Sequence, residues 1–295
     1  MLNITSNESK GMLLGIFGVI AFGLTLPITR FVVPYFNPIF IGLGRAALAT
    51  FFAISLLLIT KQSIPNKSQC YKLLIVALGV VVGFPVLSAW AMQTLPSSHG
   101  GVVLGILPLA TAIVAVFISN ERPSLGFWIF SIIGSALVII YSLLHGSGSF
   151  QVGDFALLGA IVSAAVGYAV GGQISKELGG WQVICWTLVI SFPFIFLPAW
   201  ILAPNNWLEI PFDIWVGFLY LALVSQLFGF FLWYKGLALG GIARVSQAQL
   251  IQPFITIIAS VLLFNEKLEI ITIAFALLVI STVAIGKKMP VNKKI

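Results

Sequence analysis

The chain alternates between long apolar runs and short polar connections. Each run holds about 20 residues, enough helix at about 1.5 Å per residue to cross the hydrocarbon core of a bilayer. Because the runs are continuous rather than alternating, the pattern predicts membrane-spanning helices and not the strands of a barrel. We expect ten spans, at about residues 12–33, 38–60, 72–95, 99–119, 124–144, 153–175, 181–203, 213–235, 243–264 and 269–286.

Composition supports the same fold class. Hydrophobic residues make up 60% of the 295 residues and charged residues 8%, with a mean hydropathy of +1.11. A soluble domain carries about 25% charged residues, so this chain could not cover a water-facing surface. We therefore expect an all-α polytopic membrane protein. Its two cysteines lack the spacing of a metal site and it has no phosphate-binding loop, so no cofactor is predicted and ATP is not the direct energy source.

The basic residues give the expected orientation. If the N-terminus is inside, twelve of the fifteen Lys and Arg residues fall in cytoplasmic segments. The opposite loops hold the acidic residues Asp154, Glu209, Asp213, Glu266 and Glu269. This bias predicts a protein of the cell membrane with both termini in the cytoplasm. The net charge of +7 then reflects topology and contact with anionic lipid, not binding to nucleic acid.

An internal repeat relates the two halves of the chain. Pro108 and Glu121 recur as Pro253 and Glu266, each 145 residues further on. Since each half holds five spans, an odd number, the halves must enter the membrane in opposite senses. The expected inverted repeats are residues 1–146 and residues 147–295. Exchanging the shapes of two such halves would expose a central site to either side of the membrane in turn.

Each half ends in a mid-span Pro, an aliphatic run, a Glu at a turn and a final span. The two segments read "LPLATAIVAVFISNERPSLGFWIFSIIGSALVII" and "IQPFITIIASVLLFNEKLEIITIAFALLVISTVAI". Together with "NPIFIGLGRAALATFFAI", which contains Arg45, this pattern resembles the EamA family of the drug/metabolite transporter superfamily. The resemblance covers nearly the whole chain. It implies ten helices in two five-helix repeats, and a secondary transporter that exports amino acids, other metabolites or drugs.

Glu121 and Glu266 have two interpretations. Each stands at the start of a following helix, where a carboxylate can meet free backbone N–H groups and the positive end of the helix dipole. The alternative is a direct role in transport. Because the two residues should lie at opposite membrane surfaces, a structural capping role is favoured, and they are not expected to act together.

Arg45 is the most informative charge. It lies roughly 10 Å from the outer end of the second predicted span. A charge at that depth costs roughly a few kcal/mol to insert, so it should face the bundle interior or snorkel outward. Facing inward, it would dock a carboxylate or other anionic group of the substrate. Arg30, near the end of the first span, is expected to be an interfacial anchor.

Other polar or aromatic residues fall away from the predicted membrane surfaces. Buried amides and hydroxyls need hydrogen-bond partners, which either a substrate cavity or a neighbouring helix can supply. The candidates for substrate binding, besides Arg45, are Thr25, Trp90, Tyr168, Trp186, Gln226 (beside Ser225) and Gln252. Trp90 and Trp233 could equally belong to the aromatic belts at the membrane interfaces.

Four prolines inside predicted spans are candidate hinges. They are Pro27, Pro85, Pro108 and Pro253. Each lacks a backbone N–H and permits a bend, as moving helices require. Static packing kinks are the alternative.

The expected function follows from what the spans contain. None of the acidic residues and neither His lies deep in a span, which disfavours carboxylate-based proton antiport and strongly cationic substrates. We expect a carrier that exports small, amino-acid-like metabolites by alternating access, with the lipid bilayer as its other partner and a homodimer left open. The alternatives are a multidrug exporter of the same fold, a channel, and a membrane-embedded enzyme acting on lipids or isoprenoids. An enzyme would need clustered acids or a nucleophile–base set, and the sequence shows neither.

Overall fold

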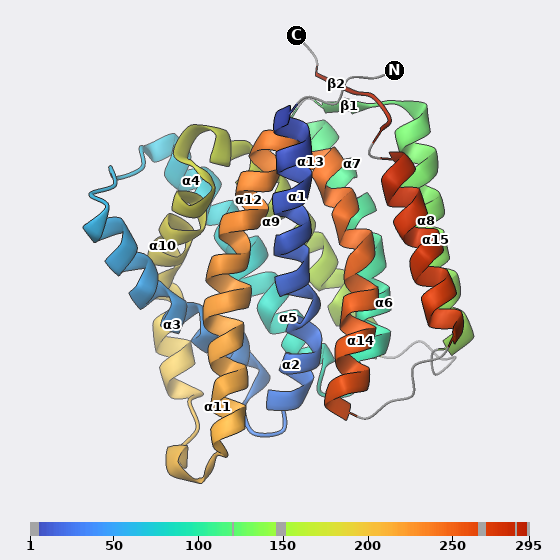
Figure 1. Cartoon of the computed structure of the whole chain (residues 1–295). Coiled ribbons are helices and arrows are strands. Elements are labelled where there is room, and N and C mark those ends of the chain that lie inside the picture. Colours follow the sequence, from blue (N-terminus) through green and yellow to red (C-terminus); the bar gives the residue numbers. More distant parts are fainter. Residues whose placement is uncertain (1–5, 120, 146–151, 265–269, 287, 294–295) are drawn as a thin grey trace.

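The protein is a bundle of helices that run between two faces (Figure 1). The computed structural model describes residues 6–119, 121–145, 152–264, 270–286 and 288–293, and it is 87% helical. We call the face where α1 (Ser6–Gly23) begins and α15 (Ile270–Gly286) ends the upper face, and the opposite one the lower face. They are the top and bottom of Figure 1.

Several helices run into one another through short segments of π-helix or 3-10 helix, which are labelled η. After α1 come α2 (Thr25–Val32), α3 (Pro38–Ile59), α4 (Lys67–Val76), η1 (Ala77–Gly83), α5 (Phe84–Ala91), α6 (Ser97–Val103), η2 (Leu104–Ile106), α7 (Leu107–Ser119), β1 (Glu121–Pro123) and α8 (Leu125–His145). Then follow α9 (Val152–Leu178), α10 (Gly180–Ile201), η3 (Trp207–Glu209), α11 (Phe212–Leu219), η4 (Tyr220–Phe228), α12 (Gly229–Gly240), α13 (Ile242–Ser246), η5 (Gln247–Ile251), α14 (Gln252–Phe264), α15 and β2 (Val291–Lys293).

Within the described residues, eight helical segments are long and apolar enough to cross a membrane. They are Ser6–Val32, Pro38–Ile59, Lys67–Ala91, Ser97–Ser119, Val152–Leu178, Gly180–Ile201, Phe212–Gly240 and Ile242–Phe264. Two shorter apolar helical stretches are Leu125–Tyr141 and Leu277–Gly286. The all-helical, multi-span fold class is thus confirmed, while the count of ten spans stays a prediction.

Local signals explain where several helices begin and end. The side chain of Asn37 accepts a hydrogen bond of 2.9 Å from the backbone N–H of Ile39, and Pro38 occupies the first turn of α3. Gly179 and Gly241 have φ values of 96° and 86°, a left-handed conformation that glycine adopts without strain. These two glycines separate α9 from α10 and α12 from α13, so each pair of helices is joined by a very short turn.

Several spans are interrupted part-way along. η1 and η4 are π-helical, and η2 and η5 are 3-10 turns. Backbone that departs from regular helix is tolerated inside a membrane only where protein or a cavity surrounds it. The interruptions therefore indicate which part of the bundle holds a site.

The four candidate hinge prolines stand at the starts of helices that follow an interruption. Pro27 in α2, Pro85 in α5, Pro108 in α7 and Pro253 in α14 each fall within the first three residues of their helix. The N–H groups of a first turn have no partner within the helix, so proline fits there without breaking a hydrogen bond. Their position suits a break in the helix, and their role as moving hinges stays a prediction.

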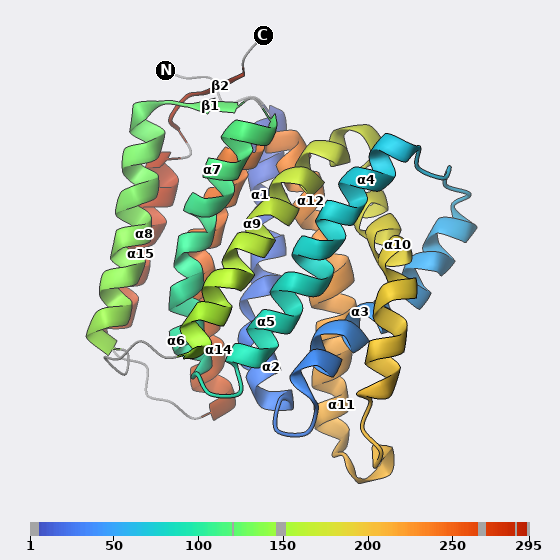
Figure 2. The same ribbon diagram turned by 180° about the vertical axis from the view of Figure 1, so that it is seen from behind.

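The bundle has two distinct edges around a packed centre. α8 and α15 lie side by side at one edge, and α3 and α10 at the other (Figures 1 and 2). In the centre, α1 and α12 approach so closely that a Cβ added to Gly11 would lie 2.4 Å from the backbone nitrogen of Gly240. Small residues allow this kind of packing between membrane helices. Trp233 of α12 is fully buried, which overturns its assignment to an aromatic belt.

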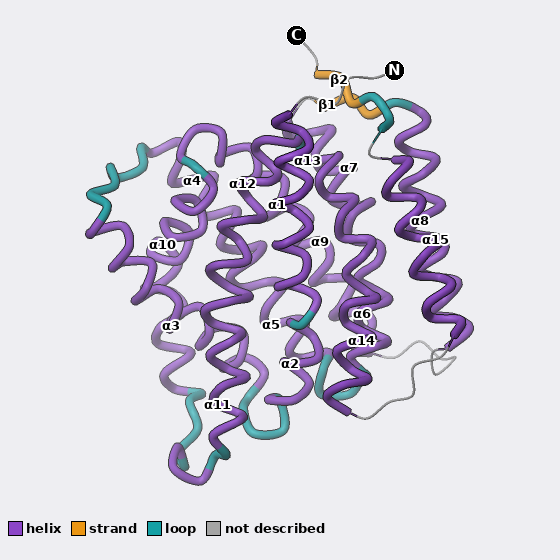
Figure 3. Tube along the Cα trace, in the orientation of Figure 1, coloured by secondary structure: helices purple, strands orange, loops and turns teal. Residues whose placement is uncertain are grey.

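A short two-stranded ribbon lies on the upper face. β1 pairs antiparallel with β2, with Glu121 opposite Lys293. The backbone N–H of Ser124 also donates a hydrogen bond of 2.9 Å to the carbonyl of Pro290. Figure 3 shows the two strands beyond the helix ends. The segment after α15 is therefore tied to the connection between α7 and α8.

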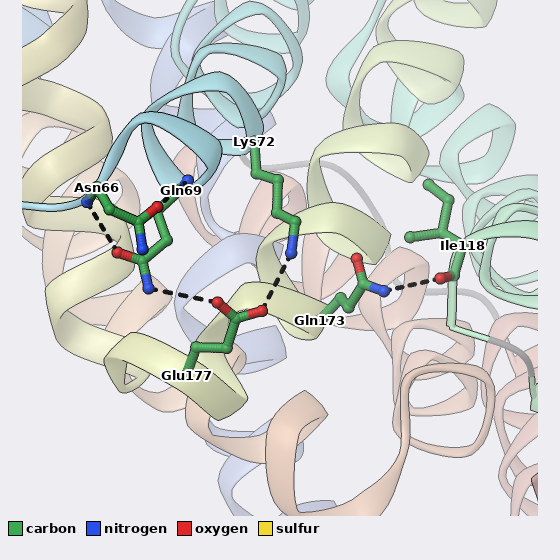
Figure 4. A network of polar contacts seen from close by, with 6 residues as sticks. All are labelled: Asn66, Gln69, Lys72, Ile118, Gln173 and Glu177. Carbon is green, nitrogen blue, oxygen red and sulfur yellow. Dashed lines mark hydrogen bonds and ion pairs between the residues drawn. The ribbon is translucent and has the colours of Figure 1, made fainter.

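A polar network joins α4, α7 and α9 near the same face (Figure 4). The Glu177 carboxylate accepts hydrogen bonds from the Lys72 ammonium at 3.0 Å and from the Gln69 amide at 3.3 Å. The Gln173 amide donates to the carbonyl of Ile118 at 2.8 Å. Because the Lys72 and Glu177 side chains stay 31% and 45% exposed, their ion pair adds at most about 1 kcal/mol to stability. The network therefore connects α4 and α7 to α9 but contributes little to stability.

Candidate functional site

A small cavity lies where the interrupted helices meet. Its wall is formed by Phe22, Thr25, Arg45, Val80, Phe84, Tyr168, Ser225, Gln226, Phe230 and Gln252. They come from α1, α2, α3, η1, α5, α9, η4, α12 and α14. The free volume is about 10 Å³, close to the room that one water molecule needs. In this conformation the cavity is closed, and a larger ligand requires the wall to move apart.

Arg45 supplies the charge of the cavity. Its side chain projects from α3, about two helical turns after Pro38, and only 2% of the residue is exposed. Its Nε is buried without a hydrogen-bond partner. Among the residues that the structure describes, no carboxylate lies within 4.0 Å of its guanidinium. Arg45 therefore faces the bundle interior, and it gives the site a positive charge that none of the described carboxylates neutralises.

Hydroxyl and amide groups line another part of the wall. The Gln226 amide in η4 donates a hydrogen bond of 3.1 Å to the carbonyl of Val80 in η1, so the two π-helical turns are joined across the cavity. The hydroxyls of Thr25 and Ser225 lie 2.8 Å apart. Turns of π-helix inside α-helices occur frequently at functional sites. These groups could exchange their present partners for polar atoms of a ligand.

Aromatic rings form a third part of the wall. Phe22 stacks on Tyr168 with ring centroids 6.2 Å apart, and Phe230 lies 5.0 Å from Phe22. Trp233 packs edge-on against Tyr168 at 5.3 Å. Aromatic pairs in such geometries stabilise each other by about 0.5–1.5 kcal/mol beyond their buried area. The cluster provides a firm apolar surface within the same cavity as Arg45.

The structure brings together most of the predicted substrate-binding residues. Those in the cavity wall are Thr25, Arg45, Tyr168, Gln226 and Gln252. Trp90 and Trp186 do not line it, and their role in substrate binding stays a prediction. Trp90 is 43% exposed, because α5 turns other residues inward, and Trp186 packs against the core from α10. That the five cavity residues bind a substrate stays a prediction.

Four apolar wall residues escaped the sequence-based prediction: Phe22, Val80, Phe84 and Phe230. Helical spacing could have found two of them. Phe22 stands three residues before Thr25, and Phe230 four residues after Gln226, so each shares a helix face with a predicted residue. Val80 and Phe84 carry no such signal, since the span around them is apolar on all sides.

Glu121 is a helix cap, but for a different helix from the one expected. Its carboxylate is 1% exposed and accepts hydrogen bonds from the backbone N–H groups of Ile242 at 2.9 Å and Ala243 at 2.8 Å. These N–H groups begin α13, and not the following helix α8 as the sequence suggested. The cause is the turn at Gly241, which directs unpaired N–H groups of α13 at the carboxylate. Glu266 lies outside the described residues.

Further polar contacts join distant segments near the lower face. His99 Nε2 in α6 lies 2.6 Å from a carboxylate oxygen of Asp154 in α9. The hydroxyls of Ser97 in α6 and Ser260 in α14 lie 2.9 Å apart. Arg30 donates hydrogen bonds to the carbonyls of Met92 and Gln93, which ties α2 to the end of α5. Within the described ranges, no group of three or more His, Cys, Asp or Glu side chains could hold a metal ion.

Comparisons with known proteins agree with one another. The model of the EamA-like transporter family matches the chain twice, at residues 9–143 and 151–285. The uncharacterized transporter YdeK of Bacillus subtilis (strain 168) is 42% identical over 287 residues, which cover 97% of this chain and 99% of that protein. The uncharacterized transporter YyaM of the same organism is 25% identical over 260 residues, 84% of each chain.

A solved structure shares the fold. One crystal structure with 14% sequence identity superposes with a TM-score of 0.74, over 95% of this chain and 96% of that chain. The family model covers most of the sequence, and YdeK covers nearly all of it. The helical, multi-span architecture is the one such a transporter needs. The chain therefore belongs to the EamA-like transporter family, within the drug/metabolite transporter superfamily.

Proposed function

We propose that this protein exports small, amino-acid-like metabolites as a secondary transporter. The observation that carries the proposal is the buried guanidinium of Arg45, which lines the central cavity without a carboxylate partner among the described residues. Burying a charge without compensation costs on the order of several kcal/mol. A substrate carboxylate would supply the missing partner, so an acid or a zwitterion fits the site better than a cation.

The rest of the cavity wall suits the remainder of such a molecule. The amides of Gln226 and Gln252 offer donors and acceptors for its polar groups. The rings of Phe22, Tyr168 and Phe230 offer an apolar surface for a side chain. Binding sites for small molecules commonly combine an apolar lining with a few polar groups that fix orientation.

Alternating access would move this site from one face to the other. We treat residues 1–146 and 147–295 as inverted repeats, and contacts between them occur at both ends of the bundle. Lys72 pairs with Glu177 near the upper face, and His99 with Asp154 near the lower face. Opening toward either face would break one pair and keep the other, while the candidate hinge prolines accommodate the bend. The distribution of basic residues supports an upper face in the cytoplasm of the cell.

Reconstitution into liposomes tests the proposal. Purified protein is given a panel of radiolabelled amino acids and related carboxylic acids, each beside its uncharged amide. We expect saturable counterflow of at least one carboxylate and weaker transport of the matching amide, because the amide cannot pair with Arg45. Non-saturable flux would indicate a channel. Preference for a lipophilic cation, or no flux of any panel member by folded protein, would contradict the proposal.

A further inference from the structure

A glutamine next to the central cavity carries an amide group that no described residue pairs with. Gln249 stands in η5, three residues before Gln252 of the cavity wall. The residue is 1% exposed, and within the described ranges neither its amide oxygen nor its amide nitrogen has a hydrogen-bond partner. Almost all buried polar groups in proteins are hydrogen-bonded, because an unpaired one raises the free energy of the folded state. Gln249 therefore has a donor and an acceptor available for a ligand.

The turn that contains Gln249 directs it to the same side as Gln252. η5 is a 3-10 helix from Gln247 to Ile251, and in such a helix side chains three residues apart eclipse one another. The chain runs from the upper face downward through α13, η5 and α14 (Figure 1). At a rise of about 2.0 Å per residue, Gln249 lies about 6 Å above Gln252. Gln249 is thus placed on the upper side of the central cavity.

Contacts with α1 place η5 beside the same wall. A Cβ added to Gly15 would touch the side chain of Val245, and one added to Gly23 would touch the side chain of Ile255. The chain between Val245 and Ile255, which includes η5, therefore follows α1 between these two glycines. Phe22, a residue of the cavity wall, belongs to that stretch of α1.

We propose that Gln249 binds the ammonium group of an α-amino acid substrate through its amide oxygen. The proposal rests on the proposed function and narrows its substrate class. The carboxylate of an α-amino acid can meet Arg45, but its ammonium group needs hydrogen-bond acceptors or other compensation for its charge. None of the residues in the cavity wall carries a carboxylate. The amide oxygen of Gln249 is an unused acceptor, and the ring faces of Phe22 and Tyr168 also attract a cation.

An α-amino acid satisfies both atoms of this amide. Its ammonium group donates to the amide oxygen, and its carboxylate, attached to the same carbon, can accept from the amide nitrogen. A carboxylic acid without an amino group would satisfy the nitrogen and leave the oxygen of Gln249 without a donor. The site should therefore prefer the amino acid to the plain acid, once the cavity wall has moved apart to admit either.

Binding of matched ligand pairs to the purified full-length protein in detergent tests the proposal. Each pair is an L-amino acid and the acid of the same carbon skeleton without the amino group: alanine with propionate, leucine with isocaproate, and phenylalanine with hydrocinnamate. Thermal unfolding measures the stabilisation by each ligand and hence its affinity. At least one amino acid should bind the wild type about tenfold or more tightly than its plain acid, because it forms one more hydrogen bond that involves a charged group.

Two substitutions in η5 form a matched pair of variants. Gln249→Met keeps an unbranched side chain of similar length but removes both amide atoms, so it should lose the preference for the amino acid and still bind the plain acid. Gln247→Met is the control. Gln247 is likewise buried, at 2% exposed, but it shares its face of the 3-10 turn with Leu250, which packs against α8 beside Gly134. It should keep the wild-type preference.

The outcomes separate this role of Gln249 from the proposed function. Equal affinity of the wild type for both members of every pair would overturn the role of Gln249 and leave the docking of a carboxylate at Arg45 intact. No binding of any ligand by the folded wild type would contradict both. An unchanged preference in Gln249→Met, with or without a higher unfolding temperature, would show that the amide only holds buried water. The same loss of preference in Gln247→Met would also overturn the inference.

Discussion

Glu121 and Ile242 are joined by a hydrogen bond of 2.9 Å, from the backbone N–H of Ile242 to a carboxylate oxygen of Glu121. The two residues are 121 positions apart and belong to different matches of the family model. The same carboxylate also accepts from the N–H of Ala243 at 2.8 Å. One buried acid therefore satisfies the start of α13 and connects the two halves of the chain.

Removing this carboxylate should destabilise the protein without changing its substrate preference. Glu121→Ala leaves two N–H groups of α13 without their acceptor, which costs about 1–2 kcal/mol in known helix caps. We expect a lower apparent unfolding temperature in detergent. Arg122→Ala is the matched control, because Arg122 is the exposed neighbour of Glu121. Equal unfolding temperatures for the two variants would show that the cap contributes nothing.

Substitutions of Arg45 and Arg30 should separate an effect on substrate binding from an effect on helix packing. Arg45→Ala removes the charge of the cavity, and loss of a charged hydrogen bond of about 1.5–3 kcal/mol should raise KM for a carboxylate substrate about tenfold or more. Arg30→Ala should instead lower the unfolding temperature and keep KM, because Arg30 donates to the carbonyls of Met92 and Gln93. Concentration-dependent uptake into proteoliposomes, with thermal unfolding of the same samples, measures both effects.

A second substitution at Arg45 distinguishes loss of substrate binding from misfolding. Arg45→Lys keeps a positive charge but cannot form the paired hydrogen bonds of a guanidinium, so its KM should fall between those of the wild type and Arg45→Ala. Near-wild-type flux in both Arg45→Ala and Arg30→Ala would remove the proposed docking of an anion.

Tyr168 lines the central cavity and carries a hydroxyl. No described residue forms a hydrogen bond with it, although the ring is 3% exposed and packed against Phe22 and Trp233. Tyr168→Phe should therefore keep the unfolding temperature, and should raise KM about two- to tenfold if the hydroxyl meets the substrate. Tyr234→Phe is the converse variant, since its hydroxyl donates to the carbonyl of Gly167 at 3.2 Å. It should lose stability with KM unchanged, and the opposite pattern would refute both roles.

The polar part of the central site could be predicted from the sequence. A Gln or Arg inside an apolar span must find a partner or a cavity, and hydropathy alone identifies such residues. Gln226 illustrates the argument, because its amide reaches the carbonyl of Val80 and its side chain lines the cavity. Thr25 and Gln252 follow the same rule. The fold class was predictable for the same reason, since composition alone determines which solvent surrounds the chain.

The inward faces of apolar helices could not be predicted. Trp90 and Trp233 stand in helices without a polar stripe, so no periodicity distinguishes the buried side from the lipid side. The structure exposes 43% of Trp90 and none of Trp233. The predicted partner of Glu121 was wrong for another reason. Dipole and capping arguments indicated a helix N-terminus correctly, but a sequence offers only the next helix as a partner, and a contact across 121 residues leaves no local pattern.

Because α1 and α12 lie so close together, we expect Gly11 to tolerate no larger residue. A Cβ at Gly11 would lie 2.4 Å from the nitrogen and 2.7 Å from the Cα of Gly240, and backbone atoms cannot rotate away. Gly11→Ala should therefore force the helices apart and cost about 1–3 kcal/mol, seen as a lower unfolding temperature. At Gly286 the nearest atom is the Cβ of Phe130 at 3.5 Å, an ordinary contact. Gly286→Ala should unfold as the wild type does, and a similar loss in both variants would contradict the argument from packing.

The two native cysteines can report the orientation of the bundle. Cys70 is partly exposed in the first turns of α4 near the upper face, whereas Cys185 is fully buried in α10. A membrane-impermeant maleimide should therefore label Cys70 and spare Cys185, with Cys70→Ser as the unlabelled control. If the excess of basic residues places the upper face in the cytoplasm, labelling should occur in inside-out vesicles and be absent in intact cells. Labelling of Cys70 in intact cells would instead place the upper face outside, and would reverse the direction assigned to every contact at that face.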